Sequence, residues 1–91
     1  MGKQYELFRL ADGFYRILIY QPDHLPPHIH LKDATGQRAA IVDLESLEVV
    51  VNDGFKQREL NYVLYYLKLR KTHVLQRWHE LQDENEADYG D

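Results

Sequence analysis

The spacing of apolar side chains changes once along this chain, close to Gly54. Before that point, short β-prone runs are separated by turn residues, and residues 14–20 carry apolar side chains on both alternating sets of positions, which is typical of a central strand. After it, apolar residues recur at helical spacing, and residues 55–89 contain neither proline nor glycine. We therefore expect an α+β fold in which a small antiparallel sheet of four to five strands packs against a long C-terminal helix.

The expected strands are separated by turn signals. Asp12-Gly13 favours a tight hairpin between the first two runs, and Gly36 indicates another turn. The helix is expected to bend near residues 70–72, because Lys71 interrupts its apolar stripe. The predicted strands comprise residues 5–10, 14–20, 28–32, 38–43 and 47–51.

Length and composition restrict the class of protein. A chain of 91 residues has room for one hydrophobic core, and an apolar content of 44% is enough to form it. Without cysteine, the chain has neither disulfides nor thiolate ligands. No run approaches the roughly 18 apolar residues of a membrane span, and the N-terminus has no apolar leader segment. We expect a soluble cytoplasmic protein with no membrane partner.

Charge is distributed unevenly along the helical part. Residues 56–71 hold five basic residues and one acidic residue, whereas residues 80–91 hold six acidic residues and no basic one. We expect residues 1–81 to form the single α+β domain and residues 82–91 a disordered acidic tail. The basic, tyrosine-rich first half of the helix makes nucleic acid a candidate partner. Its wide apolar surface also makes a homodimer a candidate.

The most chemically distinctive segment reads Asp-His-Leu-Pro-Pro-His-Ile-His, over residues 23–30. If residues 28–32 form a strand, His28 and His30 point to the same face, because alternate side chains of a strand do so. We expect this face to be the one away from the helix. Pro26 and Pro27 hold the following chain extended, with Pro27 immediately before His28. The segment therefore predicts a paired imidazole display at a stiff strand entrance.

Three functional interpretations of this pair are open. A divalent metal would be held by His28 and His30, whose nitrogens should converge on a point about 2.1 Å from each. The third ligand is unassigned, with His24, Asp23 or a residue brought in by the fold as candidates. Acid-base chemistry on a phosphodiester would use the same pair, as a hydrolase with or without metal.

The third interpretation is a rigid recognition surface, which would comprise His24, Pro26, Pro27, His28 and His30. In the plainest alternative, the histidines only cap backbone groups at a strand entrance. We take recognition of a partner protein or nucleic acid as the leading function and the hydrolase as its alternative, so that enzymatic activity stays open. The candidate catalytic residues are His24, His28, His30 and Glu59, with Glu80 as a further supporting carboxylate.

Four motifs follow one another along the chain: the histidine segment at residues 23–30, Gly54-Phe55, Glu59-Leu60 and Trp78-His79-Glu80. With these motifs the chain resembles a small bacterial family catalogued as domain of unknown function 4160, over residues 14–81. The resemblance implies a protein partner encoded nearby, because the family is often encoded beside another small domain in an arrangement similar to toxin-antitoxin pairs. It implies no established catalytic role. The acidic stretch at residues 43–48 and the acidic tail depart from the family pattern. The shared residues are His24, Pro26, Pro27, His28, His30, Gly54, Phe55, Glu59 and Trp78.

Overall fold

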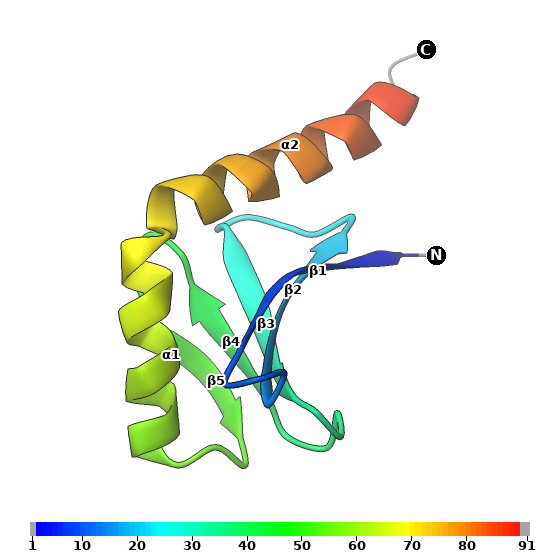
Figure 1. Ribbon diagram of the computed structural model, residues 1–91. Helices are drawn as coiled ribbons and strands as arrows, with labels where there is room; N and C mark the ends of the chain where they lie inside the picture. Colours follow the sequence, from blue (N-terminus) through cyan, green and yellow to red (C-terminus); the bar gives the residue numbers. More distant parts are fainter. Residues whose placement is uncertain (1, 90–91) are drawn as a thin grey trace.

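A computed structural model describes the backbone of residues 2–89 and the side chains of residues 2–83 (Figure 1). Its sheet has the strand order β1-β2-β3-β4-β5, and every neighbouring pair is antiparallel. Two helices follow the sheet, so the predicted α+β class is confirmed. The elements are β1 (Lys3–Leu10), β2 (Tyr15–Gln21), β3 (His28–Asp33), β4 (Ala39–Asp43), β5 (Val49–Asp53), α1 (Gln57–Leu69) and α2 (Lys71–Tyr89).

The two faces of the sheet have different surroundings. Ile17 lies opposite Leu31, and Leu31 lies opposite Ala40, so these residues share the face that belongs to the buried core. Because side chains alternate along a strand, His28 and His30 lie on the other face. The helices complete the core with Leu60, Val63, Leu67, Val74, Trp78 and Leu81, and Phe55 joins it from the turn before α1.

The helical segment consists of two helices, which corrects the expectation of one long helix. Helix α1 ends at Leu69, and α2 begins at Lys71, inside the region where a bend was predicted. The backbone N–H of Arg70 is shared between the carbonyls of Tyr66 and Leu67, at 3.1 Å each, which tightens the last turn of α1. The break lets α2 run across the end of the sheet, where β2 finishes and β3 begins (Figure 1).

Helix α2 continues to Tyr89, and so includes residues 82–89 of the segment assigned to the acidic tail. The rest of that segment, residues 90 and 91, lies outside the described residues. Within residues 2–89, neither helix is long and apolar enough to cross a membrane.

The turn before α1 depends on Gly54. Its φ of +104° lies in a region that favours glycine, and a Cβ there would stand 2.9 Å from Cγ of Arg38. The next residue is fixed by Asn52, whose side-chain oxygen accepts a hydrogen bond from the backbone N–H of Phe55 at 3.1 Å. The small turn residue therefore leaves room for Arg38 beneath the start of α1.

Candidate functional site

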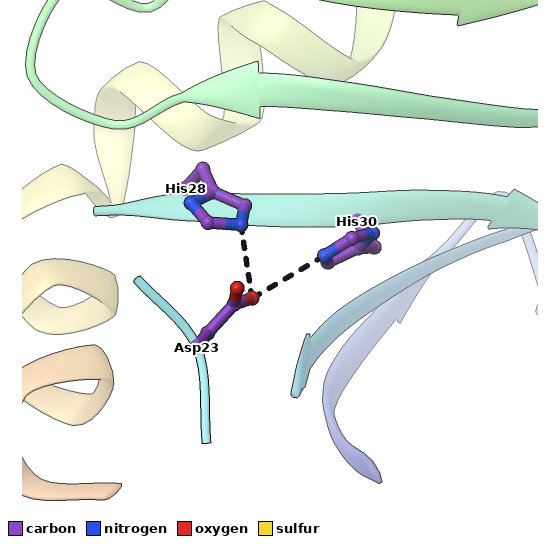
Figure 2. A group of neighbouring side chains, drawn as sticks. All are labelled: Asp23, His28 and His30. Carbon is purple, nitrogen blue, oxygen red and sulfur yellow. Dashed lines mark ion pairs between the residues drawn. The ribbon is translucent and has the colours of Figure 1, made fainter. Parts of the chain in front are cut away.

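Three side chains of the histidine segment meet at one point. Strand β3 presents His28 and His30 side by side, and the β2–β3 loop brings Asp23 over them (Figure 2). Oδ2 of Asp23 lies 2.9 Å from Nε2 of His28 and 3.4 Å from Nε2 of His30. One ligand atom from each residue lies within 4.8 Å of the others. The group could hold a metal ion, with Asp23 as the third ligand that the sequence left unassigned.

The end of α2 holds the loop in place. The backbone N–H of Asp23 donates to Oε1 of Gln82 at 2.8 Å, and Nε2 of Gln82 donates to the carbonyl of Tyr20 at 2.9 Å. A second amide, Gln21, donates to the carbonyl of Leu81. Both glutamines are buried. The role of these two glutamines was not predicted from the sequence. The sequence shows only that each amide lies next to or near an apolar core position.

Hydrogen bonding defines the state of the first imidazole. Nδ1 of His28 lies 2.7 Å from the carbonyl oxygen of Pro26. A carbonyl oxygen can only accept, so Nδ1 carries a proton and donates it. In the neutral ring, Nε2 then offers its lone pair toward Asp23. A backbone carbonyl fixing the distal nitrogen in this way is common behind metal-binding histidines.

The second imidazole is held between an aromatic ring and the carboxylate. His30 stacks on Tyr20, with ring centroids 4.1 Å apart. Burial lowers the pKa of His30, and the nearby Asp23 carboxylate opposes this shift. The lowered pKa favours the neutral ring, which has a lone pair free to bind a metal.

The remaining candidates of the segment, His24, Pro26 and Pro27, differ in their exposure. The His24 side chain is 86% exposed and contacts only the other carboxylate oxygen of Asp23 among the described ion pairs, at 3.4 Å. Pro27 is buried, and its carbonyl accepts a hydrogen bond from the backbone of Leu44 at 2.9 Å. A pocket of about 260 Å³ opens beside the group and is lined by His24, Pro26, His28, Ile41, Asp43 and Val50.

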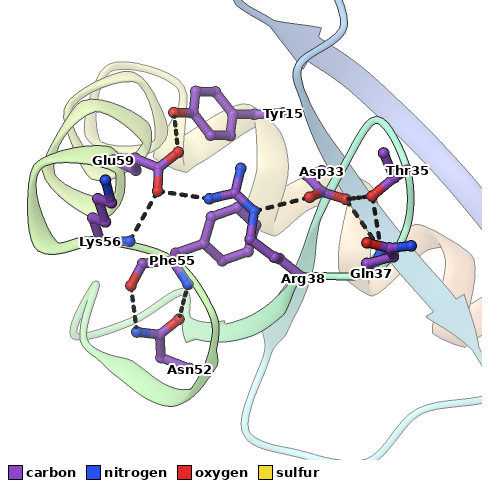
Figure 3. A network of polar contacts seen from close by, with 9 residues as sticks. All are labelled: Tyr15, Asp33, Thr35, Gln37, Arg38, Asn52, Phe55, Lys56 and Glu59. Atoms are coloured by element: carbon purple, nitrogen blue, oxygen red, sulfur yellow. Dashed lines mark hydrogen bonds and ion pairs between the residues drawn. The ribbon is translucent and has the colours of Figure 1, made fainter.

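The two carboxylates proposed as supporting groups lie elsewhere. Oε2 of Glu59 accepts a hydrogen bond from Tyr15 at 2.9 Å, and its Oε1 accepts one from Arg38 at 2.8 Å (Figure 3). Arg38 also donates to Asp33 at 2.8 Å. Glu80 is exposed and pairs with Arg77 along α2. Neither Glu59 nor Glu80 joins Asp23, His28 and His30.

The hydrogen bonds from Arg38 to Asp33 and Glu59 predict that the stability of the fold depends on pH. The hydrogen bond that Asp33 accepts from Arg38 lowers the pKa of Asp33. The pKa of Glu59 is lowered mainly by its hydrogen bond from the backbone N–H of Lys56, and further by those from Tyr15 and Arg38. Unfolded carboxyls titrate near pH 4, so below that pH the unfolded chain binds more protons. We expect the free energy of unfolding to fall as the pH drops from about 5 through the lowered pKa values.

An Arg38→Gln variant checks this dependence against the wild type. Urea unfolding between pH 6 and pH 2.5 should show a shallower loss of stability in the variant, because its Asp33 and Glu59 lose the cation that lowers their pKa values. The other carboxylates contribute equally to both proteins. Identical slopes would show that Arg38 does not control these groups.

Comparison with known proteins extends the resemblance. Residues 15–79 match the model of a family described as a domain of unknown function, DUF4160. The matched segment begins with β2 and ends within α2, and it includes the whole Asp23, His28 and His30 group. No curated protein and no solved structure matches the chain.

Proposed function

The chain belongs to the DUF4160 family, and we propose that it is a recognition domain whose β2–β3 loop is fixed by a divalent transition metal. Asp23, His28 and His30 are the proposed ligands. One observation carries the proposal: Oδ2 of Asp23 and Nε2 of His30 are buried, converge on each other and make no hydrogen bond. Buried polar atoms without a partner are rare and call for an occupant.

The contact between His28 and Asp23 supports the same conclusion. Because Nδ1 of His28 donates its proton to the carbonyl of Pro26, an Nε2 without a proton would turn its lone pair toward a carboxylate oxygen 2.9 Å away. Two acceptors at this distance repel unless a positive charge lies beside them. A proton on Nε2 would supply it, yet Oδ2 of Asp23 accepts no well-directed hydrogen bond. A metal ion shared by the three atoms satisfies all of them.

The donor set indicates which metals fit. Two imidazoles and one carboxylate suit zinc and its neighbours in the first transition row. Ligands about 2.1 Å from a tetrahedral zinc stand roughly 3.4 Å apart, close to the 2.9 and 3.4 Å separations from Oδ2 of Asp23. All three ligand atoms lie within 4.8 Å of one another, so the group is already gathered around the place that a bound ion would occupy.

The position of the group favours recognition over catalysis. The metal would tie the β2–β3 loop to β3 from beneath, where two of the three donor atoms are shielded from solvent. The loop turns its tip outward: Leu25 is 68% exposed, and the pocket of about 260 Å³ lies beside it. An apolar tip on a fixed loop is the kind of surface that a protein partner contacts.

Metal titration of the untagged protein tests the proposal. We expect the wild type to bind one equivalent of zinc and, at a free concentration 100 times Kd, to gain about 2.7 kcal/mol, or roughly 10 to 20 °C in Tm. His28→Ala/His30→Ala should bind none. The control, His73→Ala/His79→Ala, removes two exposed histidines of α2 and should bind like the wild type.

The same variants test recognition. When the chain is co-expressed with the product of the neighbouring gene, we expect the two to co-purify with the wild type and the control, and not with His28→Ala/His30→Ala. Chelation of the metal should release the partner. If His28→Ala/His30→Ala still bound zinc, the proposed metal site would be wrong. If the partner co-purified equally well with and without metal, the proposed role of the β2–β3 loop in recognition would be wrong.

A phosphodiester hydrolase is the second candidate function. It is favoured by the fourth coordination position that three protein ligands leave on zinc, and by a pocket that reaches His28. Metal-loaded protein should be assayed with labelled RNA, labelled DNA and bis(p-nitrophenyl) phosphate. Recognition predicts no difference between the wild type and His28→Ala/His30→Ala, whereas cleavage that requires both histidines would establish the hydrolase in its place.

A further inference from the structure

The outer side of α1 carries a stripe of exposed side chains, whose two tyrosine rings each have an edge-on contact with Tyr66, at centroid distances of 5.1 Å. Arg58, Tyr62, Tyr65 and Leu69 follow one another at spacings of four, three and four residues, so they lie along one line of the helix. The last three are 39%, 59% and 64% exposed. The opposite side of α1 is buried in the core. At 1.5 Å per residue, the stripe is about 16 Å long.

A pocket opens at the start of this stripe. Its volume is about 520 Å³, and its walls are Ala11, Phe14, Tyr15, Arg58, Glu59 and Tyr62. The Tyr15 hydroxyl is held by Glu59 at 2.9 Å, so this wall is fixed before any ligand arrives. A volume of this size is typical of sites for small organic groups, and three of its walls are aromatic.

The charge around the stripe is positive and uncompensated. Lys56, Arg58 and Lys68 are exposed, and none of them pairs with a carboxylate among the side chains of residues 2–83. Glu59 is the single acidic residue of residues 56–71, and it is already engaged by Arg38 and Tyr15. The stripe therefore joins exposed aromatic rings to free cations.

We propose that this stripe binds single-stranded nucleic acid. Bases would stack on Tyr62 and Tyr65, one base would enter the pocket beside Phe14, and Arg58 and Lys68 would contact phosphates. A duplex hides its base faces and offers nothing to the tyrosines. A second copy of the chain would bring identical cations together across a two-fold axis, which like-charge repulsion disfavours.

Fluorescence anisotropy with labelled ten-nucleotide RNA and DNA of mixed sequence tests the proposal on the full chain. We expect binding at 50 mM salt, at least tenfold weaker in Tyr62→Ser/Tyr65→Ser and unchanged in Tyr62→Phe/Tyr65→Phe, which keeps the rings. In Arg58→Gln/Lys68→Gln, the slope of log K against log salt should become shallower by about 1.4, because each neutralised phosphate of a single strand contributes about 0.7. Circular dichroism confirms that each variant is folded.

Three results would overturn the proposal. One is the absence of binding at 50 mM salt, and another is equal binding by the serine and phenylalanine variants. The third is binding of polyglutamate as tight as that of the oligonucleotides, which would identify an acidic protein surface as the partner. Chelators should leave oligonucleotide binding intact, so a failed metal site and a failed stripe are distinguishable.

Discussion

An Asp23→Asn variant should lose zinc binding by more than about 100-fold and, without metal, unfold at a higher urea concentration than the wild type. The loss follows because Asn removes the charged ligand, a larger change than the 10- to 100-fold effects of outer-shell substitutions. The gain follows because the amide can donate to Nε2 of His28 or of buried, unpartnered His30. One hydrogen bond of this kind contributes about 1 kcal/mol.

The sign of the metal-free effect separates two descriptions of the group. If Asp23 and the histidines formed an ordinary ion pair, Asp23→Asn would remove a favourable charge and destabilise the protein. If they form an empty metal site, the same change removes the repulsion between acceptors. Urea unfolding in EDTA measures the difference. Asp83→Asn, which makes the same charge change at an exposed position of α2, is the control and should affect neither stability nor zinc affinity.

The sheet and the first half of the helical segment were predictable because their signals are local. Alternation placed Ile29 and Leu31 in the core, and the same period of two put His28 and His30 together on the opposite face. Turn residues such as Gly13 and Gly36 separated the strands, although the last strand was predicted at residues 47–51 and is observed at Val49–Asp53. The sheet was predictable because its strands pair in sequence order, which requires no long-range crossover.

The break between α1 and α2 was only partly predictable. Lys71 interrupts the apolar stripe, which indicated a bend, but no proline or glycine is present to end the helix. Helix α1 runs beside the sheet and ends near the edge that α2 crosses (Figure 1). Beyond Leu69, a straight helix would carry Val74 and Trp78 away from the core, whereas the turn at Arg70 keeps both buried. Tertiary packing overrides the local propensity here.

The two histidines of the candidate site were predicted from the sequence, whereas the contacts that hold Asp23 beside them were not. Nothing in the spacing of Asp23 shows that the loop folds back, because this depends on Gln82, 59 residues away. Glu59 shows the opposite error. It was grouped with the histidines by chemistry, yet Arg38 and Tyr15 hold it in a separate network. Contacts between residues far apart in sequence produce no regular spacing of residue types, so the sequence alone does not reveal them.

The Trp78→Ala variant should lose about 3 to 5 kcal/mol of stability, a large share of the roughly 5 to 14 kcal/mol expected for a domain of this size. Trp78 is 2% exposed and lies in the core cluster, so it anchors α2 to the core. Its ring centroid stands 6.3 Å from that of His28. The same truncation should therefore weaken zinc binding, because the imidazole loses the surface against which it is oriented.

Trp78→Phe is the matched variant for this test. It keeps an aromatic ring and removes an indole N–H that is buried without a partner, so it should cost clearly less than the alanine substitution. Urea unfolding with and without zinc measures both effects. If alanine and phenylalanine were equally tolerated, α2 would not be anchored through Trp78. If stability fell with zinc affinity unchanged, Asp23, His28 and His30 would be positioned by the β2–β3 loop and β3 alone, independently of the helix that crosses them.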